Sequence, residues 1–235
     1  MKRLLIFGAA LLLSVSAAGA ESDRIALLIG NGDYEHAPDA ETAVIDVRSV
    51  GRALEAAGWE VTIGTDLDRE EMQDALQDLA DQGGDARDLL IYYAGHALRS
   101  AERTYLAPVD QKADSAVDVE FGAVPLSLVL RILEGADDQG VLLLDAAQVE
   151  GFRPQSFAEP GLGKIDPPKG VAIISAAPPG QAIRRTGGQE SRFARLLVDE
   201  FMRSDAKLMA TADELGAPLW VAGSASDDFA LAASV

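Results

Sequence analysis

The sequence predicts an α/β fold, built on a mainly parallel sheet of six strands with helices on both faces. Apolar runs alternate with segments of helical periodicity from residue 24 onward, which is the pattern of repeated strand-helix-strand units. Two of these runs, residues 89–94 and 141–144, are continuously apolar, as strands covered on both faces are. A chain of 235 residues is long enough to form one domain with a complete hydrophobic core.

The first predicted strand, residues 25–29, ends at the turn-forming cluster 30–32, which reads Gly-Asn-Gly. An amphipathic helix follows, and Gly58 is suited to end it in a left-handed conformation. Residues 59–63 alternate between apolar and polar side chains, so we expect a strand near the edge of the sheet. The apolar positions that recur with helical spacing in the first helix are Val47, Val50 and Leu54.

Asp68 and Glu71 have the spacing of a capping box, which predicts the start of a second helix. The pattern weakens over residues 100–118, where a small hairpin outside the main sheet is expected from Thr104, Tyr105, Leu106 and Val109. Pro125 suits the first turn of a third helix. The apolar faces predicted for these two helices are Met72, Leu76 and Leu79, and then Leu126, Val129, Leu130 and Leu133.

An irregular segment, residues 148–170, follows the second continuously apolar run, and its prolines and glycines predict a long surface loop. Residues 171–176 are the fifth predicted strand, and residues 190–203 are a helix. The last strand is expected from residues 218–222 together with 229–231.

The first twenty residues have the features of a secretory signal peptide. Lys2 and Arg3 form a basic start, residues 4–15 are apolar, and Ala18-Gly19-Ala20 gives a small-residue cleavage site. An apolar stretch of this length is shorter than the roughly 20 residues that span a bilayer. We therefore expect a periplasmic or secreted protein without stable membrane insertion after cleavage; an uncleaved amino-terminal anchor is the alternative.

Composition excludes several classes of function. Removal of Lys2 and Arg3 with the leader would leave 18 basic against 38 acidic residues, a net charge of −20. Such a charge repels nucleic-acid phosphates and anionic lipids, and it favours a protein or basic-peptide partner. The chain contains no cysteine, which excludes thiol chemistry, and only two histidines, so a zinc site has too few ligands. No cofactor is expected.

Chemically useful side chains follow two of the predicted central strands. His96 comes after strand 89–94 in a Gly-His pair, and Asp145 directly follows strand 141–144. Because the carboxyl ends of parallel strands meet at one edge of a sheet, we expect both residues at the same edge. A lone histidine is often structural, but its place after a buried strand favours a role in a site.

These residues carry a resemblance to the caspase-like cysteine peptidases, especially the bacterial and metacaspase-type members. Tyr92-Tyr93-Ala94-Gly95-His96 resembles the histidine motif of that family, and Leu143-Leu144-Asp145-Ala146 resembles the start of its Asp-Ala-Cys motif. Residues 26–31 with Tyr34 resemble the opening strand and loop. Further similarity lies in Tyr105, Leu106, Pro108 and Asp110, and in Pro218, Trp220, Asp228 and Phe229.

The resemblance implies a single caspase-like (caspase-hemoglobinase) domain over residues 21–235. It would comprise a large-subunit-like part at 24–150, the loop 151–170 and a small-subunit-like part at 171–235. Ala147 would then occupy the position of the nucleophilic cysteine, and a methyl group can neither ionise nor attack a carbonyl. His96 would be the retained catalytic histidine. The chain is therefore expected to be a catalytically inactive homologue, a protein- or peptide-binding pseudopeptidase.

By the same resemblance, Asp46 and Asp145 would line a pocket for a basic side chain, in which a carboxylate pair prefers guanidinium. Asp46 could instead be a charge in the first turn of a helix, and Asp145 a buried acid satisfied by loop amides. Ala97 stands where the family has glycine; its amide could donate to an oxyanion, but a positive φ would cost about 1 kcal/mol or more there. Ser175, at the end of the fifth strand, is expected to face the same groove.

Three alternatives to a pseudopeptidase can be weighed from the sequence. Hydrolysis could proceed through another nucleophile, such as Ser175 activated by His96. Nucleotide binding at residues 30–32 fails the dinucleotide fingerprint, because position 35 is Glu and no P-loop lysine follows. Calcium could bind a group of acids that is expected in one loop but lacks EF-hand spacing, namely Asp110, Asp114, Asp118 and Glu120.

Overall fold

The computed structural model describes residues 23–146, 158–181, 189–202 and 220–223. Its main feature is a six-stranded sheet with the order β10-β9-β7-β3-β1-β2. Five neighbouring strands are parallel, and β10 pairs with β9 in the antiparallel sense. The strands are β1 Arg24–Gly30, β2 Glu60–Thr65, β3 Asp88–Ala94, β7 Gln139–Asp145, β9 Val171–Ser175 and β10 Trp220–Gly223. The predicted fold class, a mainly parallel six-stranded sheet, is confirmed.

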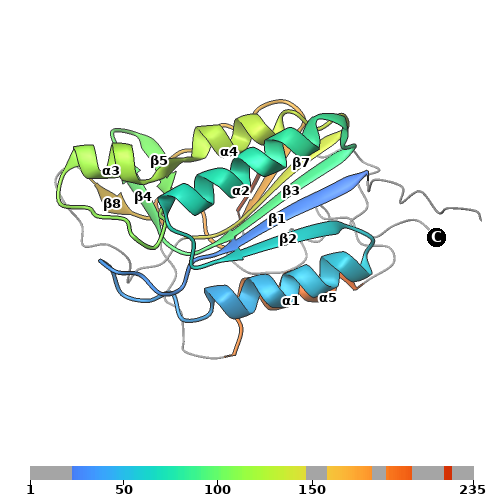
Figure 1. Cartoon of the computed structure of the whole chain (residues 1–235), viewed down its shortest axis with the longest axis horizontal. Helices are drawn as coiled ribbons and strands as arrows, with labels where there is room; N and C mark the ends of the chain where they lie inside the picture. The colour runs from blue at the N-terminus through green and yellow to red at the C-terminus, as the bar shows by residue number, and fades with distance from the viewer. Residues whose placement is uncertain (1–22, 147–157, 182–188, 203–219, 224–235) are drawn as a thin grey trace, which may run out of the picture.

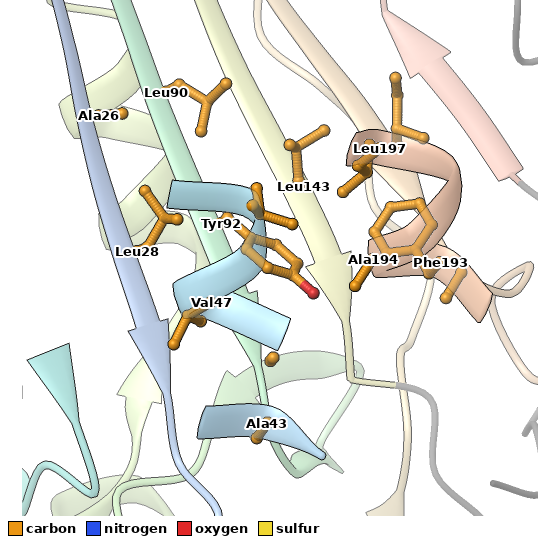
Figure 2. Packing of buried hydrophobic residues seen from close by; sticks show 14 of the residues in the cluster. Ala26, Leu28, Ala43, Val47, Leu90, Tyr92, Leu143, Phe193, Ala194 and Leu197 are labelled. Atoms are coloured by element: carbon orange, nitrogen blue, oxygen red, sulfur yellow. The ribbon is translucent and has the colours of Figure 1, made fainter. Parts of the chain in front are cut away.

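Helices cover both faces of this sheet (Figure 1). Helices α1 (Ala43–Ala56) and α5 (Arg192–Phe201) lie side by side under one face, and α2 (Arg69–Gln82) and α4 (Leu126–Leu133) cover the other. Figure 2 shows the first of these layers, where Val47 of α1 and Phe193 of α5 pack against Tyr92 and Leu143 of the central strands. Strands β1, β3, β7 and β9 are buried along their whole length, because both of their faces are covered.

A second, smaller sheet with the order β6-β5-β4-β8 lies beyond the carboxyl end of β3. Strands β4 and β5 form the small hairpin that the sequence predicts outside the main sheet, although Val109 lies past the end of the hairpin. A short helix, α3 (Ala116–Gly122), and a 3₁₀ turn (Gly83–Asp85) complete the described elements. The strands of the small sheet are β4 Ala97–Ser100, β5 Arg103–Leu106, β6 Val124–Pro125 and β8 Glu159–Pro160.

The predicted helix boundaries follow from local chemistry. Gly58 has φ 85° just after α1, so the left-handed residue that ends the helix is where the sequence places it. Asp68 accepts a hydrogen bond from the Glu71 amide at 2.9 Å, and the Glu71 carboxylate accepts one from the Asp68 amide at 3.1 Å. This reciprocal pair is the predicted capping box of α2. Pro125 differs slightly from the expectation, because it is the residue that precedes α4 rather than part of its first turn.

Two segments differ from the sequence-based expectation. Asp118 and Glu120 lie on α3 rather than in a loop, because Ser115 caps a short helix there by accepting from the Asp118 amide at 3.1 Å. Part of the predicted surface loop 148–170 is packed: β8 pairs with β4, and Leu162 and Ile165 are buried. Those two apolar side chains anchor a segment that its prolines and glycines had marked as exposed. Residues 148–157 of that loop lie outside the described part.

Among the described residues, no helix is both long and apolar enough to cross a membrane. The predicted signal segment 1–20 and the predicted strand residues 229–231 lie outside the described residues.

Candidate functional site

His96 lies at the carboxyl end of β3, where the chain leaves the main sheet for the small one. Its side chain is buried, and its Nε2 atom lies 2.6 Å from the carbonyl oxygen of Pro38 in the loop between β1 and α1. A carbonyl oxygen can only accept a hydrogen bond, so Nε2 carries the ring proton. In this tautomer of the neutral imidazole the lone pair is on Nδ1, and Nδ1 is the atom that can accept a proton.

Asp145 is the last residue of the neighbouring strand β7. The parallel register pairs Ala94 of β3 with Asp145, and the Gly95 amide donates to the Asp145 carbonyl at 3.2 Å. The Asp145 side chain is completely buried. The structure therefore brings the turn that carries His96 and the acidic end of β7 together at one edge of the sheet, as the sequence predicts for parallel strands.

The position that resembles the family nucleophile, Ala147, lies outside the described residues. The chain can be followed through Ala146, which is buried directly after β7. This described stretch ends one residue before Ala147, directly after Asp145, whose carbonyl accepts from the Gly95 amide.

Ala97 is the first residue of β4 and is buried. The non-glycine residues with positive φ in the described chain are Asp66, Ala101 and Glu102, so Ala97 carries no left-handed strain. The cost considered from the sequence for replacing glycine does not arise in this backbone conformation.

Ser175 ends β9 and is fully buried, and its hydroxyl accepts a hydrogen bond from the Ala177 amide at 3.4 Å. It pairs in register with Leu144 of β7, which in turn pairs with Tyr93 of β3. Two strand spacings of about 4.8 Å therefore separate β9 from the strand that leads to His96. The imidazole meets Pro38 in the loop after β1, on the other side of β3 from β9.

Asp46 lies in the first turn of α1 and is completely buried. One carboxylate oxygen accepts from the Thr42 hydroxyl at 2.8 Å, and the other accepts from the Ser191 amide at 2.7 Å. Ser191 is the capping residue of α5, so Asp46 links the amino-terminal ends of the two helices on one face of the sheet. Both carboxylate oxygens accept hydrogen bonds from the protein itself.

Two tyrosines beside His96 were not assigned a role from the sequence. The Tyr34 hydroxyl accepts a hydrogen bond from the His96 amide at 2.8 Å, and the Tyr93 hydroxyl lies 2.8 Å from the His96 carbonyl oxygen. Tyr34 is 62 residues from His96 in the chain, so no local pattern could reveal the contact. The only signal was the occurrence of both tyrosines in segments with family resemblance.

The acidic residues considered for calcium do not converge. Asp110 accepts a hydrogen bond from the Arg69 amide at 3.1 Å, whereas Asp118 and Glu120 lie on α3. Among the described residues there is no group of three or more histidine and carboxylate side chains that could hold a metal ion.

Comparison with known proteins gives one family and one fold. The family model described as "Caspase domain" matches residues 23–216. The human mucosa-associated lymphoid tissue lymphoma translocation protein 1 (Homo sapiens) is 33% identical over 91 residues, which are 37% of this chain and 11% of that protein. Its mouse homologue (Mus musculus) gives the same figures, so the matched segment spans about a tenth of these relatives.

Among solved structures, caspase-1 from Spodoptera frugiperda matches with a TM-score of 0.60 and 13% identity, covering 90% of each chain. At this identity the likeness concerns the fold, and it extends over most of the described sheet and helices.

Proposed function

Because this chain belongs to the caspase-domain family and contains no cysteine, we propose that it is a pseudopeptidase, which binds a protein or peptide without cleaving it. The thiolate is the attacking atom in a cysteine peptidase, and no residue of this sequence can supply it. This single property of the sequence carries the proposal. The resemblance of residues 143–146 to the Asp-Ala-Cys motif puts Ala147 in the place of the missing nucleophile.

The surroundings of His96 support a site that has lost its nucleophile but has kept its histidine oriented. The imidazole is still buried and oriented by the Pro38 carbonyl, and the amide of Gly95, the residue before His96, still donates to the Asp145 carbonyl at the end of β7. A site that had lost all constraint would not need a hydrogen bond that selects one tautomer. We therefore propose that this sheet edge forms a recess around His96 and Asp145 that is kept as a binding site.

A serine-dependent hydrolase is the second candidate, and the described geometry counts against it. Ser175 is two strands away from β3, whereas the imidazole hydrogen bond is directed to the loop after β1. A general base must come within about 2.6–3.2 Å of the hydroxyl that it activates.

We further propose that the ligand is basic. The net charge of −18 attracts cationic peptides, and the buried Asp145 places a carboxylate at the sheet edge beside His96. Guanidinium would be preferred to ammonium, because it can bond carboxylates through two donors at once. Asp46 would take part only if the ligand replaced one of its two hydrogen-bond donors, Thr42 or Ser191.

Turnover tests the absence of catalysis. The protein, His96→Ala, Ala147→Cys and Ala147→Cys/His96→Ala are incubated with fluorogenic peptides that end in Arg or Lys. We expect no hydrolysis by the parent and hydrolysis by Ala147→Cys that the second change abolishes, since general-base catalysis contributes about 10²–10⁴-fold. Parent activity that disappears in His96→Ala would refute the proposal.

Binding tests the acidic recess. Fluorescence anisotropy is measured with an Arg-ended peptide and with the same peptide ending in citrulline, which keeps the shape but lacks the charge. We expect Asp145→Asn to weaken binding of the Arg peptide by about tenfold or more, and to leave the citrulline peptide unchanged. Glu102→Gln, an exposed acid in the turn between β4 and β5, is the matched control. Equal binding of both peptides to the parent would exclude a charge-reading pocket.

Export remains a proposal based on residues 1–20. Expression of the full chain in a bacterial host, followed by fractionation and intact mass measurement, is expected to give a periplasmic product that begins at Glu21. A cytoplasmic product of full mass would contradict it.

A further inference from the structure

We propose that Tyr34 and Tyr93 are positioning residues. Their hydroxyl groups hold the backbone amide and carbonyl of His96, so that the imidazole keeps one orientation and one tautomer. The inference extends the proposed function, because it concerns how the imidazole of the recess is held. The positions of the two hydroxyls can be tested without a ligand or a nucleophile.

The two hydroxyls hold opposite ends of the same residue. The Tyr34 hydroxyl accepts from the His96 amide at 2.8 Å, and the Tyr93 hydroxyl lies 2.8 Å from both the His96 and the Ala107 carbonyl oxygens. The His96 carbonyl also accepts from the Ala107 amide at 3.0 Å. Both backbone groups of His96 are therefore fixed by partners that come from separate elements: the loop after β1, strand β3 and the residue after β5.

The tyrosines also contact each other and the imidazole itself. Their hydroxyl oxygens are 3.2 Å apart, and the Tyr34 ring packs on the His96 ring with a centroid distance of 4.4 Å and an interplanar angle of 34°. One consistent arrangement has Tyr34 donating to Tyr93 while Tyr93 donates to a carbonyl oxygen. Burial raises the pKa of Tyr93 well above its ordinary value of 10.0, so this phenol stays a donor through the neutral range.

The chain keeps room for this arrangement at Gly95. A Cβ atom on that residue would lie 2.6 Å from the Tyr34 hydroxyl and 2.7 Å from the Tyr93 hydroxyl. Any larger residue would push the two hydroxyls away from the His96 backbone. The glycine before the histidine is thus explained by the space that the tyrosine pair needs.

The orientation of the ring depends on both ends of this arrangement. Pro38 accepts from Nε2 at the tip of the imidazole, while the tyrosines fix the backbone from which the ring extends. A shift of the His96 backbone would lengthen the 2.6 Å bond to Pro38 and would allow the second tautomer to form. The hydroxyls therefore act on the imidazole through its backbone.

The test is the ¹⁵N NMR spectrum of the imidazole nitrogens, which is simple because the chain has only His36 and His96. A single neutral tautomer gives one protonated and one unprotonated nitrogen resonance that are widely separated, and a mixture moves the two together. We expect wide separation for His96 in the parent, and movement toward the average in Tyr34→Phe and in Tyr93→Phe. Each variant keeps its ring and loses only the hydroxyl.

Tyr105→Phe is the matched control, since Tyr105 is a buried tyrosine of the small sheet. It is expected to leave the His96 resonances unchanged, whatever it does to Tm. Parent-like His96 resonances in both folded Tyr34→Phe and Tyr93→Phe would overturn the proposal, as would averaged resonances in the parent. If Tyr93→Phe does not fold, Tyr34→Phe alone decides; if neither folds while Tyr105→Phe does, the pair is structural and the proposal fails.

Discussion

Replacement of Asp46 is expected to separate its structural role from a role in binding. In Asp46→Ala the Thr42 hydroxyl and the Ser191 amide both lose a charged acceptor. Hydrogen bonds to charged groups contribute about 1.5–3 kcal/mol each, so this variant should lose about 3–6 kcal/mol of unfolding free energy. In Asp46→Asn the carbonyl oxygen can still accept from Ser191, and the amide can donate to Thr42. That variant should lose only the charge-assisted part, about 1–3 kcal/mol.

The assay is urea-induced unfolding followed by circular dichroism, with linear extrapolation to water. Glu55→Gln is the control, because it removes an exposed carboxylate from the same helix and should change stability by less than about 0.5 kcal/mol. Stability of Asp46→Asn equal to or above that of the parent would refute the reasoning, since burial of the charge would then outweigh its hydrogen bonds. Arg-peptide binding in Asp46→Asn adds the second readout: a structural acid predicts unchanged affinity.

Three further predictions concern the rest of the fold. Asp88→Ala should lower the free energy of unfolding by about 3–5 kcal/mol in the same assay. The reason is that Asp88 pairs with the buried Arg24 at 3.3 Å and with Arg87 at 2.8 Å. Adding Arg24→Met to Asp88→Ala should recover much of that loss, because it removes a buried charge that no longer faces the Asp88 carboxylate. Gly30→Ala should lower the free energy of unfolding by about 1–3 kcal/mol, because the new Cβ would lie 2.6 Å from Val47 Cγ2 and 2.7 Å from the Ala43 carbonyl oxygen. Gly84→Ala is the control: its Cβ would meet nothing within 4 Å, so its stability should be close to that of the parent. Above pH 10 the unfolded chain loses the Tyr93 proton, whereas the native state retains it because burial raises the pKa of Tyr93. The free energy of unfolding of the parent should therefore fall with pH by up to about 1.4 kcal/mol per pH unit more steeply than that of Tyr93→Phe. Parallel pH profiles of the two proteins would contradict this prediction.

The main sheet could be predicted because its determinants are local. Continuous apolar runs identified β3 and β7, alternation identified the edge strand β2, and the left-handed Gly58 and the Asp68–Glu71 pair set two helix ends. Each of these signals depends on residues that are close together in the chain, so it can be recognised in the sequence.

The small sheet was predicted less completely, since its turn is built from unusual residues. Ala101 and Glu102 both adopt positive φ, at 46° and 64°, where glycine or asparagine would have given a recognisable signal. The pairing of β8 with β4 depends on chain segments about sixty residues apart.

The candidate site shows the same limit. The placement of His96 and Asp145 at one sheet edge follows from strand ends and could be predicted. Pro38 and Tyr34 could not, because their contacts with His96 join a loop and a strand end across about sixty residues. The second hydrogen bond of Asp46 likewise comes from Ser191, 145 positions away.

The most direct test of a recess that lacks only its attacking atom is covalent labelling of Ala147→Cys, read by intact mass. A peptidyl chloromethyl ketone ending in Arg is the probe, and Gln148→Cys provides a thiol one position further along the chain. We predict rapid single labelling of Ala147→Cys near neutral pH, slowed strongly by His96→Ala, and slow labelling of Gln148→Cys. Equal, His96-independent labelling rates for the two thiols would contradict the account.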